Sequence, residues 1–272
     1  MSGIHPRAIV APSAIIGEGV TVGPWCQVGP HATLGDHVNL ISHVVVDGHT
    51  KIGEAAVLYP FCTVGMAPQD LKYKGEETRC EVGARTQVRE HVTIHRGTVT
   101  GTGLTKVGDD CLLMAGVHVA HDCELGNGVV MANNVLMGGH VSVGANAVIG
   151  GGAAIHQFTR IGRAAMVGGM AGVEADVIPF GTVLGNRAHL AGLNVVGLRR
   201  RGYDRGQIHA VRAAFRMIFR GEGVFSERVE QARSQYGHEV LVAEILAFID
   251  MDSRRGLIRS AAPDDGQDDD AA

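Results

Sequence analysis

Isoleucine, leucine or valine recurs at every sixth position in the first part of this chain, and this period constrains the fold more than any other feature. The series runs from Ile4 to Val64, and a second series with the same spacing, which includes methionine, runs from Val107 to Val173. Three further anchors lie between the two series: Val82, Val88 and Ile94. Neither the helical period of about 3.6 residues nor the alternation of an ordinary strand gives this spacing. A hexapeptide repeat of this kind indicates a parallel β-helix.

Three hexads make one coil of triangular cross-section, so residues eighteen apart in the sequence stack vertically. The large apolar residue points into the prism, a small residue four positions later fits where two sides converge, and a nearby glycine relieves strain at the corner. No hexad can bury its own apolar face, so stability comes from stacked neighbours. After the repeat, apolar residues follow helical spacing, and Ser226 is expected to cap a middle helix. We predict a mainly β fold, a parallel β-helix followed by a small C-terminal α-helical domain.

The composition agrees with a solenoid that has tight corners and a narrow core, since the 272 residues include 39 glycines and only 4% aromatics. The net charge of −4 is mild and gives no reason to expect a nucleic-acid partner. All five cysteines fall on the small, inward position of the hexad, where a buried thiol serves as a small apolar group. The paired spacings of a disulfide framework or a zinc cluster are missing. These cysteines are Cys26, Cys62, Cys80, Cys111 and Cys123.

The start of the chain enters the repeat at once, without the charged region, apolar stretch and cleavage site of a signal peptide. No run of residues approaches the ~20 apolar residues of a transmembrane helix. We therefore expect a cytoplasmic protein with no transmembrane segment.

The hexad pattern divides the chain into three parts. We predict that residues 1–190 form the β-helix, that residues 191–258 form the helical domain, and that residues 259–272 form a disordered acidic tail. The repeat is interrupted twice, so excursion loops are expected at about 65–81 and 95–106. Loops that leave a rigid scaffold are where function concentrates.

The segment Leu112–Cys123 is the chemically densest part of the chain. His121 follows the anchor Val119 by two positions, so its side chain should point outward, with Asp122 beside it. The coils lie about 4.8 Å apart, so residues one or two coils later should reach the same outer face within about 10 Å. The residues that stack in this way, or are adjacent to those that do, are Gly139, His140, His156 and Gln157, and His118 comes from the preceding strand of the same coil.

Several imidazoles beside one carboxylate, with no outward serine or cysteine nucleophile, suit general-base chemistry on a bound hydroxyl or amine. A lone surface histidine usually does nothing, but five polar groups that converge through one stack favour a site. A zinc site is the alternative. Hexapeptide enzymes related to carbonic anhydrase bind zinc through histidines of which two are five apart on one coil, whereas His118 and His121 are three apart. We therefore expect no metal.

Seven motifs resemble the bacterial UDP-N-acetylglucosamine O-acyltransferase family, which begins lipid A synthesis, and the resemblance covers nearly the whole chain. Together they are far more specific than the hexad repeat alone. The motifs are Gln69–Tyr73 (QDLKY), Thr93–Thr98 (TIHRGT), Gly103–Gly108 (GLTKVG), His118–Cys123 (HVAHDC), Gly138–Val143 (GGHVSV), His156–Phe158 (HQF) and Arg255–Arg259 (RGLIR).

This resemblance implies a left-handed β-helix and a homotrimer with active sites between subunits. It also implies transfer of a 3-hydroxyacyl chain from acyl carrier protein to the 3-position of UDP-N-acetylglucosamine. No cofactor is implied, because the donor is the phosphopantetheine thioester of acyl carrier protein. His121 matches the family's catalytic base, Asp122 matches the acid that orients it, and Gly139 matches the residue whose N–H stabilises the oxyanion.

The remaining matches concern substrate binding. Asp70 and Lys72 match a loop pair that contacts the sugar nucleotide, while Asn194, Arg200 and Arg201 match nucleotide-contacting positions. His118, His140, His156 and Gln157 match the substrate pocket. Gly169 matches a position that sets acyl-chain length, and a glycine there favours a long chain over the alternative of a simple corner glycine. Two positions depart from the family pattern, because Val196 replaces a glutamate and Arg187 replaces a histidine.

Three alternatives stay open. The same base would serve an acceptor that carries a 3-amine in place of the 3-hydroxyl. The related hexapeptide N-acyltransferase of lipid A synthesis carries an extra N-terminal uridine-binding domain, and this chain starts directly in the repeat. A non-enzymatic β-helix scaffold would be expected to have uninterrupted hexads and no histidine stack, and both expectations disagree with this sequence.

Overall fold

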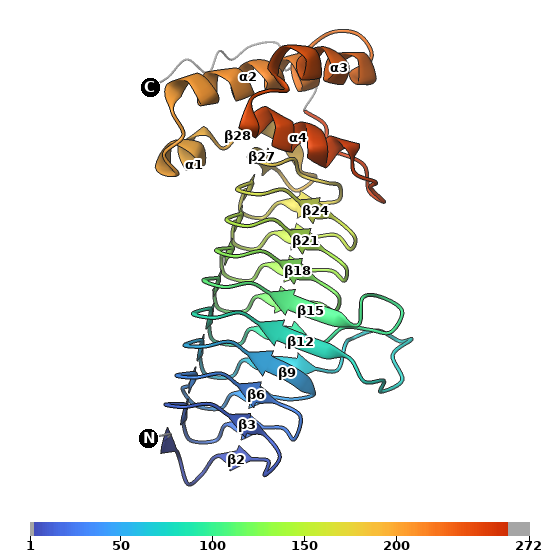
Figure 1. Cartoon of the computed structure of the whole chain (residues 1–272). Helices are drawn as coiled ribbons and strands as arrows, with labels where there is room; N and C mark the ends of the chain where they lie inside the picture. The colour runs from blue at the N-terminus through green and yellow to red at the C-terminus, as the bar shows by residue number, and fades with distance from the viewer. Residues whose placement is uncertain (1–2, 261–272) are drawn as a thin grey trace.

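The computed structural model describes residues 3–260, which form a triangular prism of three parallel sheets with helices across its C-terminal end (Figure 1). Each coil contributes one short strand to each sheet, and the strands pair with those of the next coil. We name the sheets A, B and C in the order in which the chain visits them. The fold class predicted from the hexads, a parallel β-helix followed by helices, is confirmed.

Sheet A has eleven strands, of which only the last pair is antiparallel. Its strands are β1 (Gly3–Ile4), β4 (Thr21–Val22), β7 (Asn39–Leu40), β10 (Val57–Leu58), β13 (Gln87–Val88), β16 (Leu112–Leu113), β19 (Val130–Met131), β22 (Val148–Ile149), β25 (Met166–Val167), β27 (Gly181–Leu184) and β28 (His189–Leu193). Sheet B consists of β2 (Ile9–Val10), β5 (Gln27–Val28), β8 (Val45–Val46), β11 (Thr63–Met66), β14 (Thr93–His95), β17 (His118–Val119), β20 (Leu136–Met137), β23 (Ala154–Ile155) and β26 (Gly172–Val173). Sheet C consists of β3 (Ile15–Ile16), β6 (Thr33–Leu34), β9 (His49–Ile52), β12 (Arg79–Val82), β15 (Leu104–Val107), β18 (Glu124–Leu125), β21 (Ser142–Val143) and β24 (Arg160–Ile161).

The prism is filled by the anchor residues of the hexads. Leu113, Met131 and Ile149 stack through sheet A and are each fully buried. The five cysteines are also buried and free, as expected for thiols at the small inward position. Burial raises the pKa of the Cys62 thiol to about 12, so it is a protonated core group at neutral pH.

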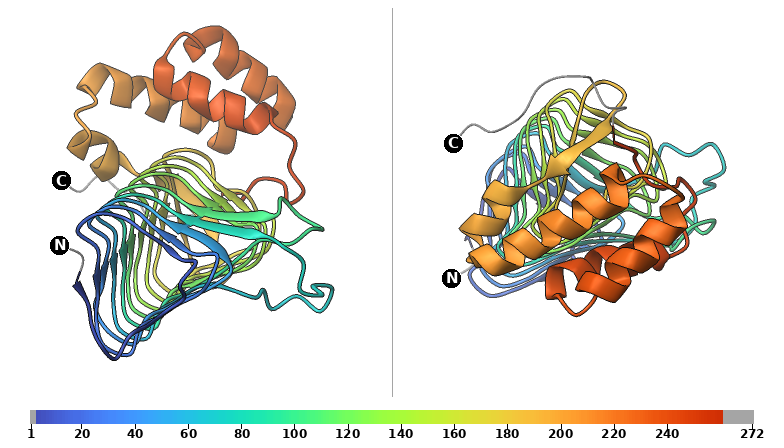
Figure 2. Two further views of the ribbon diagram at one scale, coloured as in Figure 1. Left: turned by 60° about the horizontal axis from the view of Figure 1, so that its bottom comes forward. Right: turned by 90° about the horizontal axis from the view of Figure 1, so that it is seen from above.

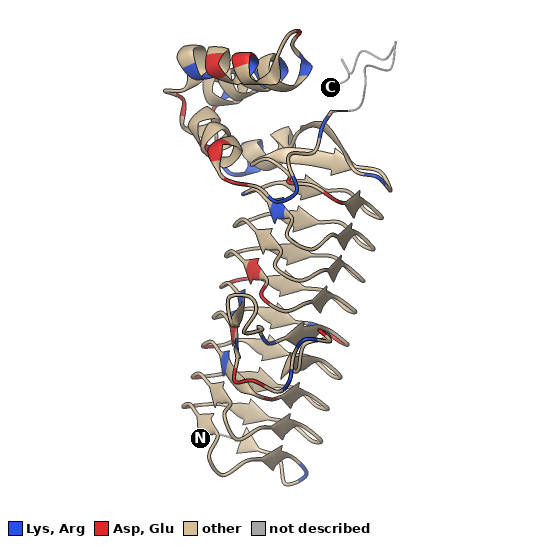
Figure 3. Cartoon of the chain, turned by 90° about the vertical axis from the view of Figure 1, so that its right-hand side faces the viewer, with Lys and Arg blue, Asp and Glu red and all other residues tan. Residues whose placement is uncertain are grey.

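Both excursions leave the prism at the corner between sheets B and C, and they protrude side by side (Figures 1 and 2). Residues 67–78 connect β11 to β12, and residues 96–103 connect β14 to β15. Both segments lie inside the loops expected from the sequence. Charged residues gather on the excursions and on the helices, while the prism walls carry few (Figure 3).

Four helices follow the prism: α1 (Val195–Arg200), α2 (Arg205–Arg220), α3 (Phe225–Tyr236) and α4 (Val240–Asp250). Two ion pairs fix this end of the molecule. Arg163 binds Glu244 of α4 with an N–O distance of 2.6 Å, and Arg160 binds the buried Asp176 at 2.7 Å. Within residues 3–260, no helix is long and apolar enough to cross a membrane.

Three details at this end correct the expectations from sequence. Helix α3 starts at Phe225, one residue before Ser226, and has no side-chain cap, because its N-cap residue is the apolar Val224. The prism continues through β28, so residues 191–193 are strand and not helical domain. Arg259 and Ser260, predicted as the start of the tail, pair with Leu190 of β28. The rest of the predicted tail lies outside the described residues.

Candidate active site

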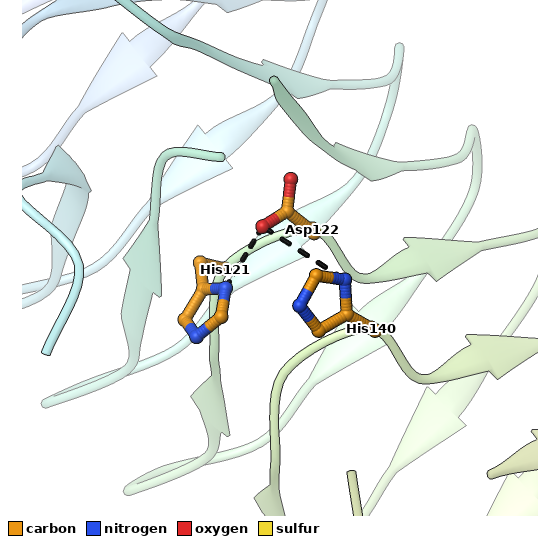
Figure 4. A group of neighbouring side chains, drawn as sticks. All are labelled: His121, Asp122 and His140. Atoms are coloured by element: carbon orange, nitrogen blue, oxygen red, sulfur yellow. Dashed lines mark hydrogen bonds and ion pairs between the residues drawn. The ribbon is translucent and has the colours of Figure 1, made fainter. Parts of the chain in front are cut away.

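The histidine cluster lies at the corner between sheets B and C, beside the 96–103 excursion (Figure 4). His121 and Asp122 form the turn between β17 and β18, and His140 occupies the matching turn one coil later, between β20 and β21. The N–H of His140 donates to the carbonyl of His121 at 3.0 Å, which joins the two turns. Asp122 and His140 have φ of 59° and 61°, the left-handed region that glycine usually occupies. Coil stacking therefore places the side chains together, as the eighteen-residue arithmetic predicted.

His121 and Asp122 form the central pair. The Nδ1 atom of His121 lies 2.8 Å from Oδ2 of Asp122, and Nδ1 of His140 lies 4.0 Å from the same oxygen (Figure 4). The rings of His121 and His140 are perpendicular, with centroids 5.1 Å apart. His140 also stacks on Phe158, with ring centroids 4.5 Å apart; sequence analysis quoted Phe158 within a motif but did not assign it to the site. This packing restricts both imidazoles to narrow ranges of orientation.

Gly139 makes room for the His121 ring. A Cβ atom on residue 139 would lie 2.6 Å from Cε1 and 2.8 Å from Nε2 of His121, which is closer than side chains can pack. Within residues 3–260, no hydrogen bond uses the Gly139 N–H as donor, although its carbonyl accepts from Phe158. The buried backbone next to His121 thus offers an uncommitted donor.

The Asp122 carboxylate is completely buried and held by many donors. Thr98 donates through its hydroxyl at 2.6 Å and its N–H at 3.1 Å, and Thr102 donates through its N–H at 2.9 Å. The Thr102 hydroxyl and the Gly103 N–H donate at 3.1 Å. Burial alone would raise the pKa of Asp122, but hydrogen bonds from His121 and Thr98 outweigh it and hold the pKa well below its usual range. Asp122 is therefore an anion at neutral pH.

His118, in the same coil as His121, forms a second imidazole pair with His95 of the preceding coil. Their ring centroids lie 4.9 Å apart, and Nδ1 of His118 shares a hydrogen bond with the Thr93 hydroxyl at 2.7 Å. Burial, followed by the positive charges of His118, His121 and Arg96, lowers the pKa of His95 to about 4. Burial and the charge of His121 also lower the pKa of His118. Sequence analysis missed His95, because the excursion makes the strand pairs Thr93–His118 and Ile94–Val119 lie 25 residues apart and not eighteen.

His156 and Gln157 lie one coil beyond His140 and are both exposed. The carbonyl of Gln157 accepts hydrogen bonds from Arg255 at 2.8 Å and from Nδ1 of His156 at 3.2 Å. These contacts tie the turn to the C-terminal segment. Both side chains lie at the edge of the site.

Asp70 and Lys72 lie in the 67–78 excursion, at the same corner as His121. Asp70 is half-buried and accepts from the N–H of Lys72 at 2.9 Å, while the Lys72 side chain is exposed. The loop is anchored by Arg96, which donates to the Tyr73 hydroxyl at 2.9 Å. Burial lowers the pKa of His140, and the negative charges of Asp122 and Asp70 act against this lowering.

The remaining predicted site residues lie at other corners of the prism. Gly169 is between β25 and β26, at the corner of sheets A and B. Arg200 and Arg201 end helix α1, and Arg201 donates at 2.7 Å to the carbonyl of Asn146, at the corner of sheets C and A. Arg200 is exposed. Within one chain, the structure therefore does not bring Gly169, Arg200 or Arg201 to the histidine cluster.

Asn194 has a structural role that sequence analysis did not foresee. Its side-chain oxygen accepts from the Gly197 N–H at 2.9 Å, which caps α1, and its amide nitrogen donates to the Ala164 carbonyl at 3.0 Å. The two departures from the family pattern, Val196 and Arg187, are both exposed.

His121, Asp122 and His140 are close enough for a metal ion, since one possible ligand atom from each lies within 4.8 Å of the others. The carboxylate does not fit this role, because both its oxygens already accept hydrogen bonds from buried donors. A cation would have to displace those donors and face an imidazole pair in which His121 already uses Nδ1. The donor chemistry of the cluster thus disfavours a metal, and the absence of one stays a prediction.

Comparisons with known proteins agree on one family. A model described as UDP N-acetylglucosamine O-acyltransferase, domain 2, matches residues 176–258, and a model of bacterial transferase hexapeptides matches residues 104–139. Proteins named acyl-(acyl-carrier-protein) UDP-N-acetylglucosamine O-acyltransferase match from Paracoccus denitrificans, at 49% identity over 71% of this chain and 73% of the relative, and from Rhizobium leguminosarum bv. trifolii, at 48% identity over 82% and 81%.

Solved structures give the same picture. A structure from Acinetobacter baumannii, titled LpxA, has a TM-score of 0.89 and 41% identity, covering 94% of this chain and 99% of its own. A UDP-N-acetylglucosamine acyltransferase from Campylobacter jejuni has a TM-score of 0.89 and 33% identity, covering 95% of this chain and 100% of its own. The agreement thus extends over the prism and the helices together.

Proposed function

The chain belongs to the acyl-(acyl-carrier-protein) UDP-N-acetylglucosamine O-acyltransferase family, and from this premise we propose how its residues carry out the reaction. The protein is an O-acyltransferase of lipid A biosynthesis with the left-handed parallel β-helix of that family. Its substrates are acyl carrier protein loaded with an acyl chain and UDP-N-acetylglucosamine. The finer proposal is a 3-hydroxyacyl chain delivered to the 3-hydroxyl of the sugar. The observation that carries it is an imidazole oriented by a buried carboxylate, beside a residue whose backbone N–H makes no hydrogen bond within residues 3–260.

His121 is the general base in this proposal. Asp122 is an anion and accepts the Nδ1 proton of His121, which leaves the Nε2 lone pair free to take a proton. As the sugar hydroxyl loses its proton to Nε2, its oxygen attacks the thioester carbonyl carbon and a C–O bond forms. The C–S bond then breaks, and the leaving thiolate takes the proton back from His121. Charge and atoms balance without any further reactant.

Gly139 stabilises the intermediate. The carbonyl oxygen of the thioester becomes an oxyanion when the sugar attacks, and a backbone N–H aimed at that oxygen lowers the barrier. The Gly139 N–H is unused by other groups of the described chain and lies next to the His121 ring. A hydroxyl attacking a thioester needs a base and an oxyanion donor, and no step calls for a cofactor, since acyl carrier protein takes part as a substrate.

The other predicted residues bind substrate in this proposal. His118, His140, His156 and Gln157 lie along the B–C corner around His121, with Asp70 and Lys72 on the adjoining excursion. Arg200 and Arg201 offer cationic groups to the diphosphate of the nucleotide. Asn194 is proposed to act mainly by capping α1 and so holding these arginines in position.

We further propose a homotrimer. The predicted catalytic, nucleotide-binding and acyl-chain residues occupy three different corners of one prism, and a ring of three copies would bring unlike corners together. The proposal can be tested with mixed trimers of His121→Ala and Arg200→Ala chains, each of low activity alone. In an equal mixture that assembles at random, about one interface in four joins a chain with native His121 to a neighbour with native Arg200. About a quarter of native activity should therefore return. If both residues served one intrachain site, mixing would restore nothing.

Helix α2 offers a surface for the acidic carrier protein. Beyond its first turn, its exposed residues are all basic: His209, Arg212, Arg216 and Arg220. The helix carries no acidic residue, and none of the ion pairs within residues 3–260 includes one of these four. Such a uniform face attracts a partner of opposite charge.

A cytoplasmic location is also proposed. The five cysteines of the chain are free and buried, which suits a reducing compartment.

The decisive experiment is mass spectrometry of the product that the purified protein makes. Acyl carrier thioesters of several lengths are offered with UDP-N-acetylglucosamine, and in parallel with its 3-amino analogue. The proposal predicts an ester at the sugar 3-position with the hydroxyl acceptor. A product formed only from the amine would make the protein an N-acyltransferase, and the proposed acceptor would be wrong.

A further inference from the structure

We infer that Thr98 is a positioning residue for the transfer, whose hydroxyl aims Oδ2 of Asp122 at the base His121. The inference rests on the proposed role of His121. It concerns the 96–103 excursion, which is the segment that encloses Asp122.

The excursion supplies most of the contacts to the carboxylate. Six protein donors reach the Asp122 oxygens, and five of them come from residues 98–103. The Thr98 hydroxyl, at 2.6 Å, is the closest of the six. It donates to Oδ2, the oxygen that also faces Nδ1 of His121 at 2.8 Å. Thr98 and His121 thus share one acceptor atom.

Burial makes this contact hard to replace. Thr98 is 2% exposed and the Asp122 side chain is fully buried, so solvent has no access to the shared oxygen. Gly101 closes the excursion over the carboxylate, since a Cβ there would lie 2.4 Å from Cγ of Asp122. If the Thr98 hydroxyl were lost, no water could take its place, and the carboxylate could rotate toward its remaining donors.

The shared oxygen also determines how strongly Asp122 acts on His121. A donor on Oδ2 draws off part of the negative charge that would otherwise stabilise a protonated imidazole. Removing that donor should make the imidazolium more stable and orient it less strictly. The first effect moves the acidic limb of the pH–rate profile to higher pH, and the second lowers kcat.

The test compares Thr98→Val, which keeps the size of the side chain, with Thr98→Ser, which keeps the hydroxyl. For Thr98→Val we expect kcat to fall roughly tenfold to a hundredfold, the size expected for losing one hydrogen bond to a buried charged group, with KM nearly unchanged. Its acidic limb should move to higher pH. Thr98→Ser should restore both kcat and the profile. Val99→Ala is the control, because Val99 lies in the same excursion, is exposed and has no polar side-chain atom that could reach Thr98 or Asp122.

Two results would overturn the inference. One is a Thr98→Val enzyme with an unchanged pH–rate profile, even if kcat falls, because a merely structural role would lower activity without moving the limb. The other is a Thr98→Ser enzyme as impaired as Thr98→Val, which would make the methyl packing responsible.

A nuclear magnetic resonance measurement separates this inference from the proposed reaction. In protein with isotopically labelled histidine, the Nδ1 proton of His121 should give a signal that shifts in Thr98→Val and stays in place in Val99→Ala. If the native enzyme transferred no acyl chain but this shift appeared, the proposed function would fail while the positioning of His121 by Thr98 would stand. An identical signal in native protein and Thr98→Val would refute the positioning itself.

Discussion

At the scale of single residues, the site depends on polar side chains that occupy turn positions with positive φ. Asp122 and His140 adopt φ near 60°, where most non-glycine residues are strained. The same conformation recurs at other corners, as at Trp25 and Phe61, so the strain belongs to the prism and not to the site alone. What distinguishes the site is the chemistry placed there. Each coil returns one such turn to the same corner, which lets a carboxylate and an imidazole meet.

The role of His121 can be tested by removing its ring. His121→Ala should lower turnover by ~10²-fold or more, because no other group replaces the base. The protein should still fold, because the Asp122 carboxylate keeps its five donors from the 96–103 excursion. His37→Ala is the control, because His37 is an exposed imidazole at a different corner of the prism, between β6 and β7. Near-normal turnover of pure His121→Ala would show that another group is the base.

The lowered pKa of His95 predicts how the stability of the fold changes with pH. Its pKa is lowered to about 4, chiefly by burial, whereas an unfolded histidine titrates near 6.5. The folded chain therefore binds fewer protons than the unfolded chain between these values, and the stability that is present above about pH 6.5 should decline as the pH falls toward 4. Urea unfolding at several pH values should show a shallower decline for His95→Asn. An equal decline in both proteins would contradict the assignment.

At the scale of elements, the short strands are held in place by the apolar side chains that they pack inside the prism. Each strand is only two to five residues long, too short to be stable alone. Its inward anchor packs on the anchors of the coils above and below, as Met131 and Ile149 do. The helices also depend on contacts with the prism, since Glu244 of α4 forms an ion pair with Arg163.

Ile149 tests this packing. The residue is fully buried on β22, so Ile149→Asp would bury an unpaired carboxylate and cost several kcal/mol. Thermal melting should show a large loss of stability. Leu136→Asp is a suitable control, because Leu136 points outward from β20 and is 52% exposed. Equal melting of Ile149→Asp and the parent would mean that the inward register is wrong.

Helix α2 gives a prediction about the carrier protein. Reversal of Arg212 and Arg216 to glutamate should raise the KM for the acyl carrier thioester several-fold and make it less sensitive to salt. The KM for a carrier-free acyl-pantetheine donor should stay the same. Arg233→Glu on α3 changes the charge of a different, ion-paired position and serves as control. A rise in KM for both donors would argue against docking on α2.

At the scale of the whole molecule, the residues with different proposed roles lie at different corners of the prism. Its B–C corner carries the proposed base, its A–B corner carries Gly169, and its C–A corner carries the arginines of α1. A rigid solenoid cannot bend these corners toward one another, so the composite site that we propose would need more than one copy of the chain.

Gly169 gives the prediction at this scale. Its φ is not in the left-handed region, and a Cβ would meet only the Gly151 carbonyl oxygen, at 3.4 Å, so the backbone does not require glycine. An apolar chain gains about 0.8 kcal/mol for each buried methylene, and Gly169→Met should block the distal ones. Competition between long and short acyl carrier thioesters should show a preference several carbons shorter. An unchanged preference in a well-folded trimer would mean that the groove ends elsewhere, with Arg187 the next position to test.

The sequence alone was sufficient for the architecture and for the centre of the site. A strict period of six leaves one geometry in which the anchors from Val22 to Val173 are buried, so the prism, its inward cysteines and the stacking of His140 on Asp122 follow from counting. The family resemblance added the roles proposed for Asp122 and Gly139, and these roles stay predictions until activity is measured.

Only the tertiary structure decided what lies outside the period. An excursion leaves the eighteen-residue register, so counting could not reveal that Thr98 and Thr102 fold back onto Asp122. Counting also missed His95, because the excursion shifts the register, and it did not foresee that Asn194 caps α1. Periodic segments repeat the same contacts from coil to coil, so a count along the sequence finds them. The contacts of Thr98, His95 and Asn194 each occur once, so only the complete fold reveals them.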